Sequence, residues 1–169
     1  IWHPTTRFDA RTLFTTAILA MLVVIAEQLA IDLPIPYTRV TVSVSSAVNF
    51  AAVLTVGPFW GVLAAVVGAV VDDLLERREP IKMLVNANNF ALQGVIAGPI
   101  YYALAQAGSP LSSLANFGAM LLAALTSSIA QTLLLGIVLS VAMGTSAWYL
   151  WRSMARGLLV EFLALPALG

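Results

Sequence analysis

Nearly all charged residues of this chain gather in four short clusters, and this arrangement limits the possible folds more than any other feature. The clusters fall at 7–11, 32–39, 72–82 and 152–156. Between them run apolar stretches of about 17–25 residues, the length that crosses a hydrocarbon core of about 30 Å as a helix. Because hydrophobic residues make up 60% of the chain and charged residues only 9%, too few polar faces remain for a water-soluble fold. We therefore predict an all-α integral membrane protein, a six-helix transmembrane bundle that forms a single transmembrane domain over 1–169.

The breakers between the apolar stretches predict how the spans are connected. Gly57-Pro58 leaves room only for a tight turn, so spans two and three should form a helical hairpin. The stretch 111–144 is too long for one simple span, which predicts a short interfacial helix followed by a fifth span over 118–142. The segment 41–46 alternates with period two, which is typical either of an extended segment packed on protein or of the start of the second helix.

Small residues recur four positions apart on three of the expected helices. This spacing lets two helix backbones approach closely inside a membrane. Gly61 and Ala65 therefore indicate that the third span is a central packing element. The residues expected to serve helix packing or a partner surface are Ala26, Ala30, Gly61, Ala65, Gly94 and Gly98.

Polar side chains within the spans are the candidates for a binding site, because an unpaired charge at the bilayer centre costs about 3 kcal/mol or more. Glu27 lies deep in the first span and Asp72 ends the third. On the fourth span, Asn86, Asn89 and Gln93 share one helical face. The candidate ligand-binding residues are Glu27, Asn49, Asp72, Asn86, Asn89 and Gln93.

A structural role is open for each of these residues. Glu27 can pair with an arginine or reach the interface, and amides commonly form hydrogen bonds between neighbouring helices. For Asp73 a structural interpretation is favoured, as part of a solvated helix end that pairs with nearby basic residues such as Arg77 and Arg78.

The composition excludes several classes of function. The chain has no cysteine and a single histidine, so we expect no metal site and no cofactor such as haem. The sequence contains no catalytic constellation and no glycine-rich phosphate loop, so we expect no catalytic residues and no enzymatic activity. The formal net charge of +0 gives no basic surface for nucleic acid.

The stretch from 49 to 105 combines a glycine-proline turn, an acidic end of the third span and an asparagine-rich fourth span. The residues of this pattern are Gly57, Pro58, Gly61, Asp72, Asp73, Pro80, Leu84, Asn86, Asn89, Phe90 and Ala91. On these residues the stretch resembles two related groups of bacterial membrane proteins. One group comprises the membrane regions that precede GGDEF or HD-GYP signalling domains. The other comprises the substrate-binding S components of energy-coupling factor (ECF) vitamin transporters, which are six-helix bundles of about this size.

The resemblance to the signalling group implies the first hypothesis, a ligand-sensing input module that is followed by a cytoplasmic domain after Gly169. The second hypothesis is an S component of an ECF-type vitamin or micronutrient transporter. A third is a small structural subunit of a larger membrane complex. All three place the chain in the cytoplasmic (inner) membrane of a bacterium. The expected partners are the lipid bilayer, a small polar or vitamin-like ligand, and another membrane protein or a second copy of the chain, with no nucleic acid among them.

Overall fold

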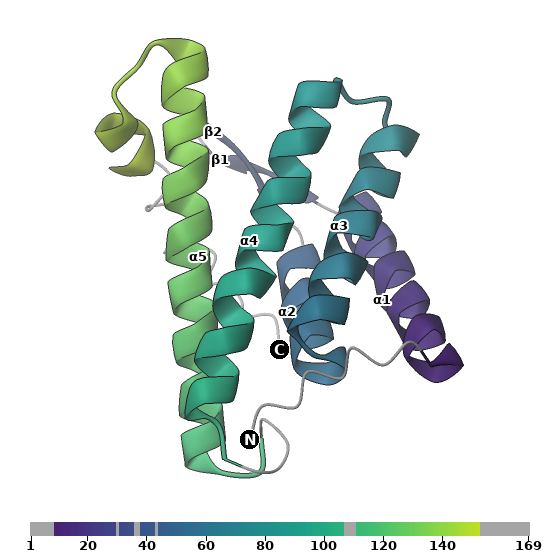
Figure 1. Cartoon of the computed structure of the whole chain (residues 1–169). Helices are drawn as coiled ribbons and strands as arrows, with labels where there is room; N and C mark the ends of the chain where they lie inside the picture. Colours follow the sequence, from purple (N-terminus) through teal and green to yellow (C-terminus); the bar gives the residue numbers. More distant parts are fainter. Residues whose placement is uncertain (1–8, 30, 36–37, 43, 107–110, 153–169) are drawn as a thin grey trace.

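The computed structural model describes residues 9–29, 31–35, 38–42, 44–106 and 111–152 of the chain. Helices build the bundle, which confirms the all-α fold class, and a short β-hairpin connects the first two of them (Figure 1). Three of the helices in this part of the chain, α1, α3 and α5, are apolar and long enough to cross a membrane. The elements are α1 (Ala10–Gln28), β1 (Ile31–Ile35), β2 (Thr38–Val42), α2 (Ser45–Val56), α3 (Pro58–Leu75), α4 (Pro80–Leu104) and α5 (Leu114–Met143).

The β-hairpin resolves the two alternatives for the period-two segment. Strands β1 and β2 pair antiparallel, with Ile31 opposite Val42 and Ile35 opposite Thr38. Helix α2 begins only at Ser45. The alternating segment is therefore divided, with its first residues in a strand and its last residues in the second helix.

Local sequence rules account for the predicted hairpin of α2 and α3. Gly57 has a φ of 89°, a left-handed value that side chains disfavour. Pro58 then occupies the first turn of α3, where its missing N–H leaves no helical hydrogen bond unmade. Together the two residues end one helix and begin the next without a loop.

Helix α3 lies between α1, α2 and α4, and close contacts at glycines explain this central place. A methyl group on Gly61 would lie 2.5 Å from Cα of Val53 in α2. On Gly68 it would lie 2.7 Å from Cβ of Val23 in α1, and on Gly98 it would lie 2.7 Å from Cγ of Pro58. Helix backbones thus touch where the sequence provides no side chain.

The remaining packing candidates lie within these interfaces. Ala26 and Ala65 are buried inside the bundle, and Gly94 lies against Val62 of α3. Ala26 therefore serves contacts within the chain. Ala30 lies outside the described residues.

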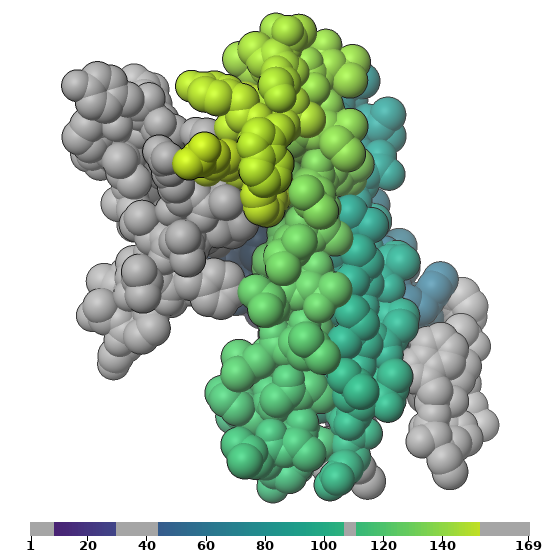
Figure 2. All heavy atoms as spheres, turned by 90° about the vertical axis from the view of Figure 1, so that its left-hand side faces the viewer, coloured from purple at the N-terminus to yellow at the C-terminus, as the bar shows by residue number. Residues whose placement is uncertain are grey.

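Helix α5 differs from the prediction of two separate helices. It is continuous from Leu114 to Met143 and packs along α4, as Figure 2 shows from the side. The side chain of Ser113 caps its first turn by accepting a hydrogen bond from the backbone N–H of Asn116 (3.1 Å). No proline interrupts the 30 residues that follow, and Gly118 alone does not break a helix. A long apolar run can simply extend beyond the hydrocarbon core.

After α5, residues 147–152 are again helical. They lie where the sequence predicts that the sixth helix begins. Between α4 and α5, the packed core comprises Ala97, Tyr101, Ala119 and Ala123.

Candidate ligand-binding site

Two adjacent carboxylates at the end of α3 organise a polar cluster. Asp72 and Asp73 are each only 1% exposed. Because neighbouring residues on a helix point about 100° apart, Asp72 faces α1 and Asp73 faces α4. Each carboxylate therefore meets a different helix.

Amide groups supply the hydrogen bonds that these carboxylates require. Gln28 at the end of α1 donates from Nε2 to Oδ1 of Asp72 (2.6 Å). Asn86 in the first turns of α4 donates from Nδ2 to both carboxylate oxygens of Asp73 (3.0 and 3.3 Å). The two carboxylates of α3 are thus hydrogen-bonded to uncharged side chains of two neighbouring helices.

Arg78 provides the positive charge of the cluster, and the way α3 ends explains its position. Arg77 adopts a left-handed conformation (φ 54°). The backbone N–H of Arg78 donates to the carbonyl of Asp73 (2.9 Å), and that of Arg77 donates to the carbonyl of Leu74 (3.2 Å). This is the Schellman pattern, which reverses the chain at a helix C-terminus. The side chain of Arg78 is thereby directed back toward the carboxylates.

The guanidinium of Arg78 contacts three carboxylates. Its Nη1 lies 2.8 Å from Oδ1 of Asp73, and its Nη2 lies 2.5 Å from Oε2 of Glu76 and 3.9 Å from Oδ2 of Asp72. Burial lowers the pKa of Arg78, but Glu76, Asp73 and Asp72 outweigh this effect and raise the pKa above its ordinary value. The arginine is therefore a permanent cation.

A cavity of about 130 Å³ lies beside this cluster. Three acidic side chains and one basic side chain line it, together with two amides, so it is rich in hydrogen-bond acceptors. The lining residues are Glu27, Ala69, Asp72, Asp73, Arg78, Asn86, Asn89 and Phe90.

Four of the six predicted site residues meet at this cavity: Glu27, Asp72, Asn86 and Asn89. The other two lie outside its lining. Asn49 is fully buried in α2. Gln93 is buried on α4 and donates from Nε2 to the backbone carbonyl of Ser46 (3.0 Å).

The sequence interpretation missed the place of Asp73 in this cavity. The predicted pairing with a nearby arginine is present, through Arg78. The predicted solvated helix end is absent, because Asn86 of α4 covers the last turn of α3 on one side. The adjacent acidic pair Asp72-Asp73 was the available signal, since two neighbouring faces of a helix in a bundle both meet neighbouring helices.

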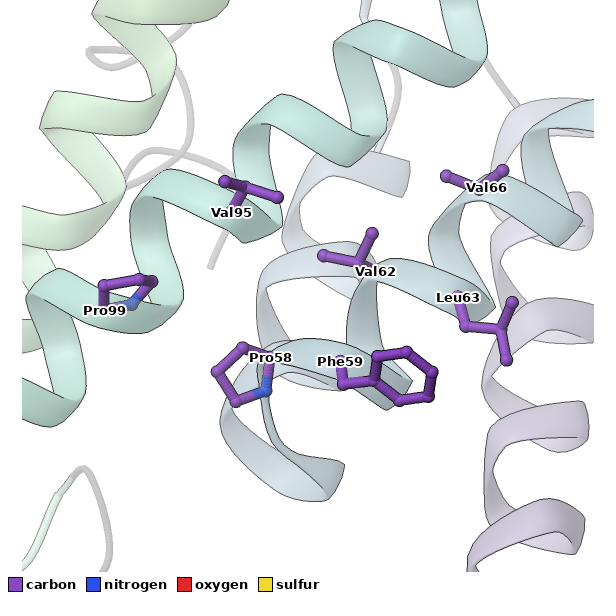
Figure 3. Close-up of a pocket in the computed structure, with 7 residues that line it drawn as sticks. All are labelled: Pro58, Phe59, Val62, Leu63, Val66, Val95 and Pro99. Carbon is purple, nitrogen blue, oxygen red and sulfur yellow. The ribbon is translucent and has the colours of Figure 1, made fainter. Parts of the chain in front are cut away.

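A second hollow, of about 380 Å³, is chemically different. Its lining side chains come from α3 and α4 alone and are all apolar (Figure 3). Two of them, Phe59 and Val95, are more than half exposed. Binding sites for small molecules combine apolar walls with a few placed polar groups. The polar cavity has such groups and this hollow does not.

The polar cavity is suited to binding a ligand that donates hydrogen bonds. Carboxylates accept hydrogen bonds only, and Phe90 provides an apolar wall. Among the described residues, no three histidine, cysteine or acidic side chains are arranged to hold a metal ion.

Comparisons with known proteins agree with a ligand-binding membrane protein. Residues 7–164 match the sequence model of the family described as "ECF-type riboflavin transporter, S component". Among curated protein sequences there is no significant match. The fold is similar to that of a solved chain reported under "Structure and mechanism of the S component of a bacterial ECF transporter", with a TM-score of 0.59 and 18% sequence identity. The similarity covers 90% of this chain and 97% of that chain.

These matches overturn the first functional hypothesis. The chain is not a sensory input module of a GGDEF or HD-GYP signalling protein, and the alternative, an S component, is supported instead. The residues behind the resemblance explain the error. Gly57-Pro58, Gly61 and the charged end of α3 determine how helices turn and pack. Such features indicate a membrane fold and do not indicate its function.

Proposed function

Because the chain belongs to the family of S components of ECF-type riboflavin transporters, we propose that it is the riboflavin-binding subunit of such a transporter. It is an integral membrane protein of a bacterial family, and we place it in the cytoplasmic membrane. Its task is to hold the vitamin within the bilayer, and it performs no chemistry on it.

The polar cavity is the observation that carries this proposal. Riboflavin joins a flat, largely apolar ring system to a chain of hydroxyl groups. The carboxylates of Glu27, Asp72 and Asp73 accept hydrogen bonds from N–H and O–H donors, including the N–H of the ring system, while Phe90 offers a surface for apolar contact. The cavity of about 130 Å³ is smaller than the 300–1,000 Å³ of common ligand pockets, so it accommodates one end of the vitamin.

Transport requires partners that this chain does not contain. The sequence has no glycine-rich phosphate loop with which to use a nucleotide. Energy must therefore come from other subunits, and we propose a membrane-embedded coupling subunit together with ATPases. An S component binds the substrate, and these partners drive its release.

Riboflavin binding to the purified protein tests the proposal. Flavin fluorescence falls when a flavin packs against protein groups, so titration in detergent gives a Kd. We expect Asn86→Ala and Asn89→Ala each to weaken binding about tenfold, the equivalent of one lost hydrogen bond with a polar ligand. The matched control is Asn88→Ala, because Asn88 is exposed and its Nδ2 bonds the carbonyl of Leu84 in its own helix (2.8 Å).

Thermal stability separates a binding role from a structural one. Weaker riboflavin binding supports the site. Asn89→Ala should show it at an unchanged unfolding temperature, whereas Asn86→Ala should also lower the unfolding temperature because Asn86 bonds the buried Asp73. If Asn86→Ala and Asn89→Ala lower the unfolding temperature but leave Kd unchanged, the amides only hold helices together. A wild-type protein that binds no riboflavin overturns the proposed substrate.

A further inference from the structure

Four buried amide atoms lack a hydrogen-bond partner in the described part of the chain. They are both polar atoms of the Asn49 side chain, Oδ1 of Asn89 and Oε1 of Gln93. Asn49 is 1% exposed and Gln93 is 4% exposed. A buried polar group without a partner destabilises a protein by about 1–3 kcal/mol. Native proteins seldom retain several together unless another molecule supplies the missing bonds.

Two contacts between α2 and α4 define the position of Asn49. One helical turn before it, the carbonyl of Ser46 accepts the hydrogen bond from Gln93. One turn after it, Val53 lies against Gly94, where an added methyl group would come within 3.1 Å of its Cγ2. Asn49 and Val53 share one face of α2, because they are four residues apart. The Asn49 amide therefore lies at the level of Gln93 and Gly94, between the two helices.

The polar cavity connects to this level through Asn89. Asn89 lines the cavity and precedes Gln93 by four residues, so the two side chains stand one above the other on α4. Moving inward from the cavity, the unpartnered atoms thus follow in the order Asn89, then Gln93 and Asn49. Asn89 belongs to the lining of the cavity, and Gln93 and Asn49 lie beyond that lining, deeper in the bundle.

The chemistry of the four atoms indicates what they bind. Three are amide oxygens, which accept hydrogen bonds, and one is an amide NH₂, which donates. The oxygen assignment of Gln93 follows from its partner, since the carbonyl of Ser46 can only accept. Hydroxyl groups both donate and accept, so successive hydroxyls on a chain can satisfy all of these atoms.

We propose that Asn49, Asn89 and Gln93 form an inner subsite that binds the hydroxyl chain of the substrate. This inference rests on the proposed function and adds an orientation to it. The polyol enters between α2 and α4, and the ring system remains toward the carboxylates and Phe90. Water molecules offer the same hydrogen-bonding chemistry, and the experiment distinguishes them from substrate hydroxyls.

A cycle of two proteins and two flavins tests the subsite. Lumiflavin carries a methyl group where riboflavin carries its hydroxyl chain, and Asn49→Leu replaces the amide by an apolar side chain of similar size. We expect Asn49→Leu to weaken riboflavin binding about tenfold and to leave lumiflavin binding unchanged. Thr55→Val is the control on the same helix, because Thr55 is exposed and its hydroxyl donates to the carbonyl of Ala51 (2.7 Å).

The outcomes are distinct. If Asn49→Leu lowers the affinity for both flavins equally, or for neither, the subsite is overturned. The amides then bind water, or they do not contact the ligand. If Asn49→Leu does not fold, Asn49→Ser retains a donor and an acceptor, and its loss of affinity must still be confined to riboflavin. A wild-type protein that binds neither flavin contradicts the proposed function itself, which is a separate result.

Discussion

Replacing Gly61 by alanine tests how closely α2 and α3 pack. The new methyl group would lie 2.5 Å from Cα and 2.6 Å from the backbone nitrogen of Val53. Ordinary contacts between such atoms are about 3.5–4.0 Å. A backbone cannot rotate aside as a side chain can, so α2 as a whole must move away by about 1 Å.

The size of the effect follows from comparison with a glycine in open space. Gly118 lies within α5, and an added methyl group there meets nothing within 4 Å. Gly118→Ala should therefore gain the helix preference of alanine, about 0.5–1 kcal/mol. Gly61→Ala gains the same preference but adds overpacking, which costs about 1–3 kcal/mol and more where backbone must shift. We expect the Gly61→Ala protein to be less stable than the Gly118→Ala protein by about 1–3 kcal/mol.

Thermal unfolding in detergent, followed by tryptophan emission, measures this difference. Trp60 is 1% exposed and neighbours Gly61, so it is a buried contributor to the emission next to the substituted position. The reasoning is refuted if Gly61→Ala unfolds at the same temperature as Gly118→Ala or at a higher one.

Two further substitutions test the polar cluster and the connection between α4 and α5. Arg78→Gln leaves Asp73 buried without its cation, so the free energy of unfolding should fall by about 1–3 kcal/mol. The control Lys82→Gln breaks only the exposed pair with Glu79 (3.5 Å) and should change the free energy of unfolding by less than about 0.5 kcal/mol. Equal unfolding temperatures for the two variants would contradict the role of Arg78. Asn116→Ala removes the side chain that bonds both the N–H (2.6 Å) and the carbonyl (3.2 Å) of Gln106. Limited proteolysis should then cleave the α4–α5 connection faster. An unchanged cleavage rate would argue that the Asn116–Gln106 hydrogen bonds do not hold this connection in place.

Features set by local chemistry could be predicted from the sequence. The Gly57-Pro58 turn follows from one positive φ and one proline at a helix start, and the structure has the predicted hairpin there. The face shared by Asn86 and Asn89 follows from helical periodicity, and both line the cavity. Glu27 was expected deep in the first span but lies in the last turn of α1, where it lines the same cavity as Asp72.

Features that depend on neighbouring elements could not be predicted. The burial of Asp73 requires knowing that α4 begins beside the last turn of α3, and a sequence does not state which helices are neighbours. The continuity of α5 was missed because the expected length of a span was applied to a helix with no breaker. The choice of function depended on helix-turn residues that several membrane folds share, and only the family match decided it.

The shortness of α2 has a consequence for how water reaches the protein. At a rise of about 1.5 Å per residue, its 12 residues extend about 18 Å, whereas the 18 residues of α3 extend about 27 Å. Both helices meet at the Gly57-Pro58 turn, so α3 continues for about 9 Å beyond the far end of α2. Asp72 and Asp73 lie in this last part of α3, which α2 no longer flanks. We expect a hydrated vestibule at this depth, through which a polar vitamin can reach the carboxylates without entering hydrocarbon.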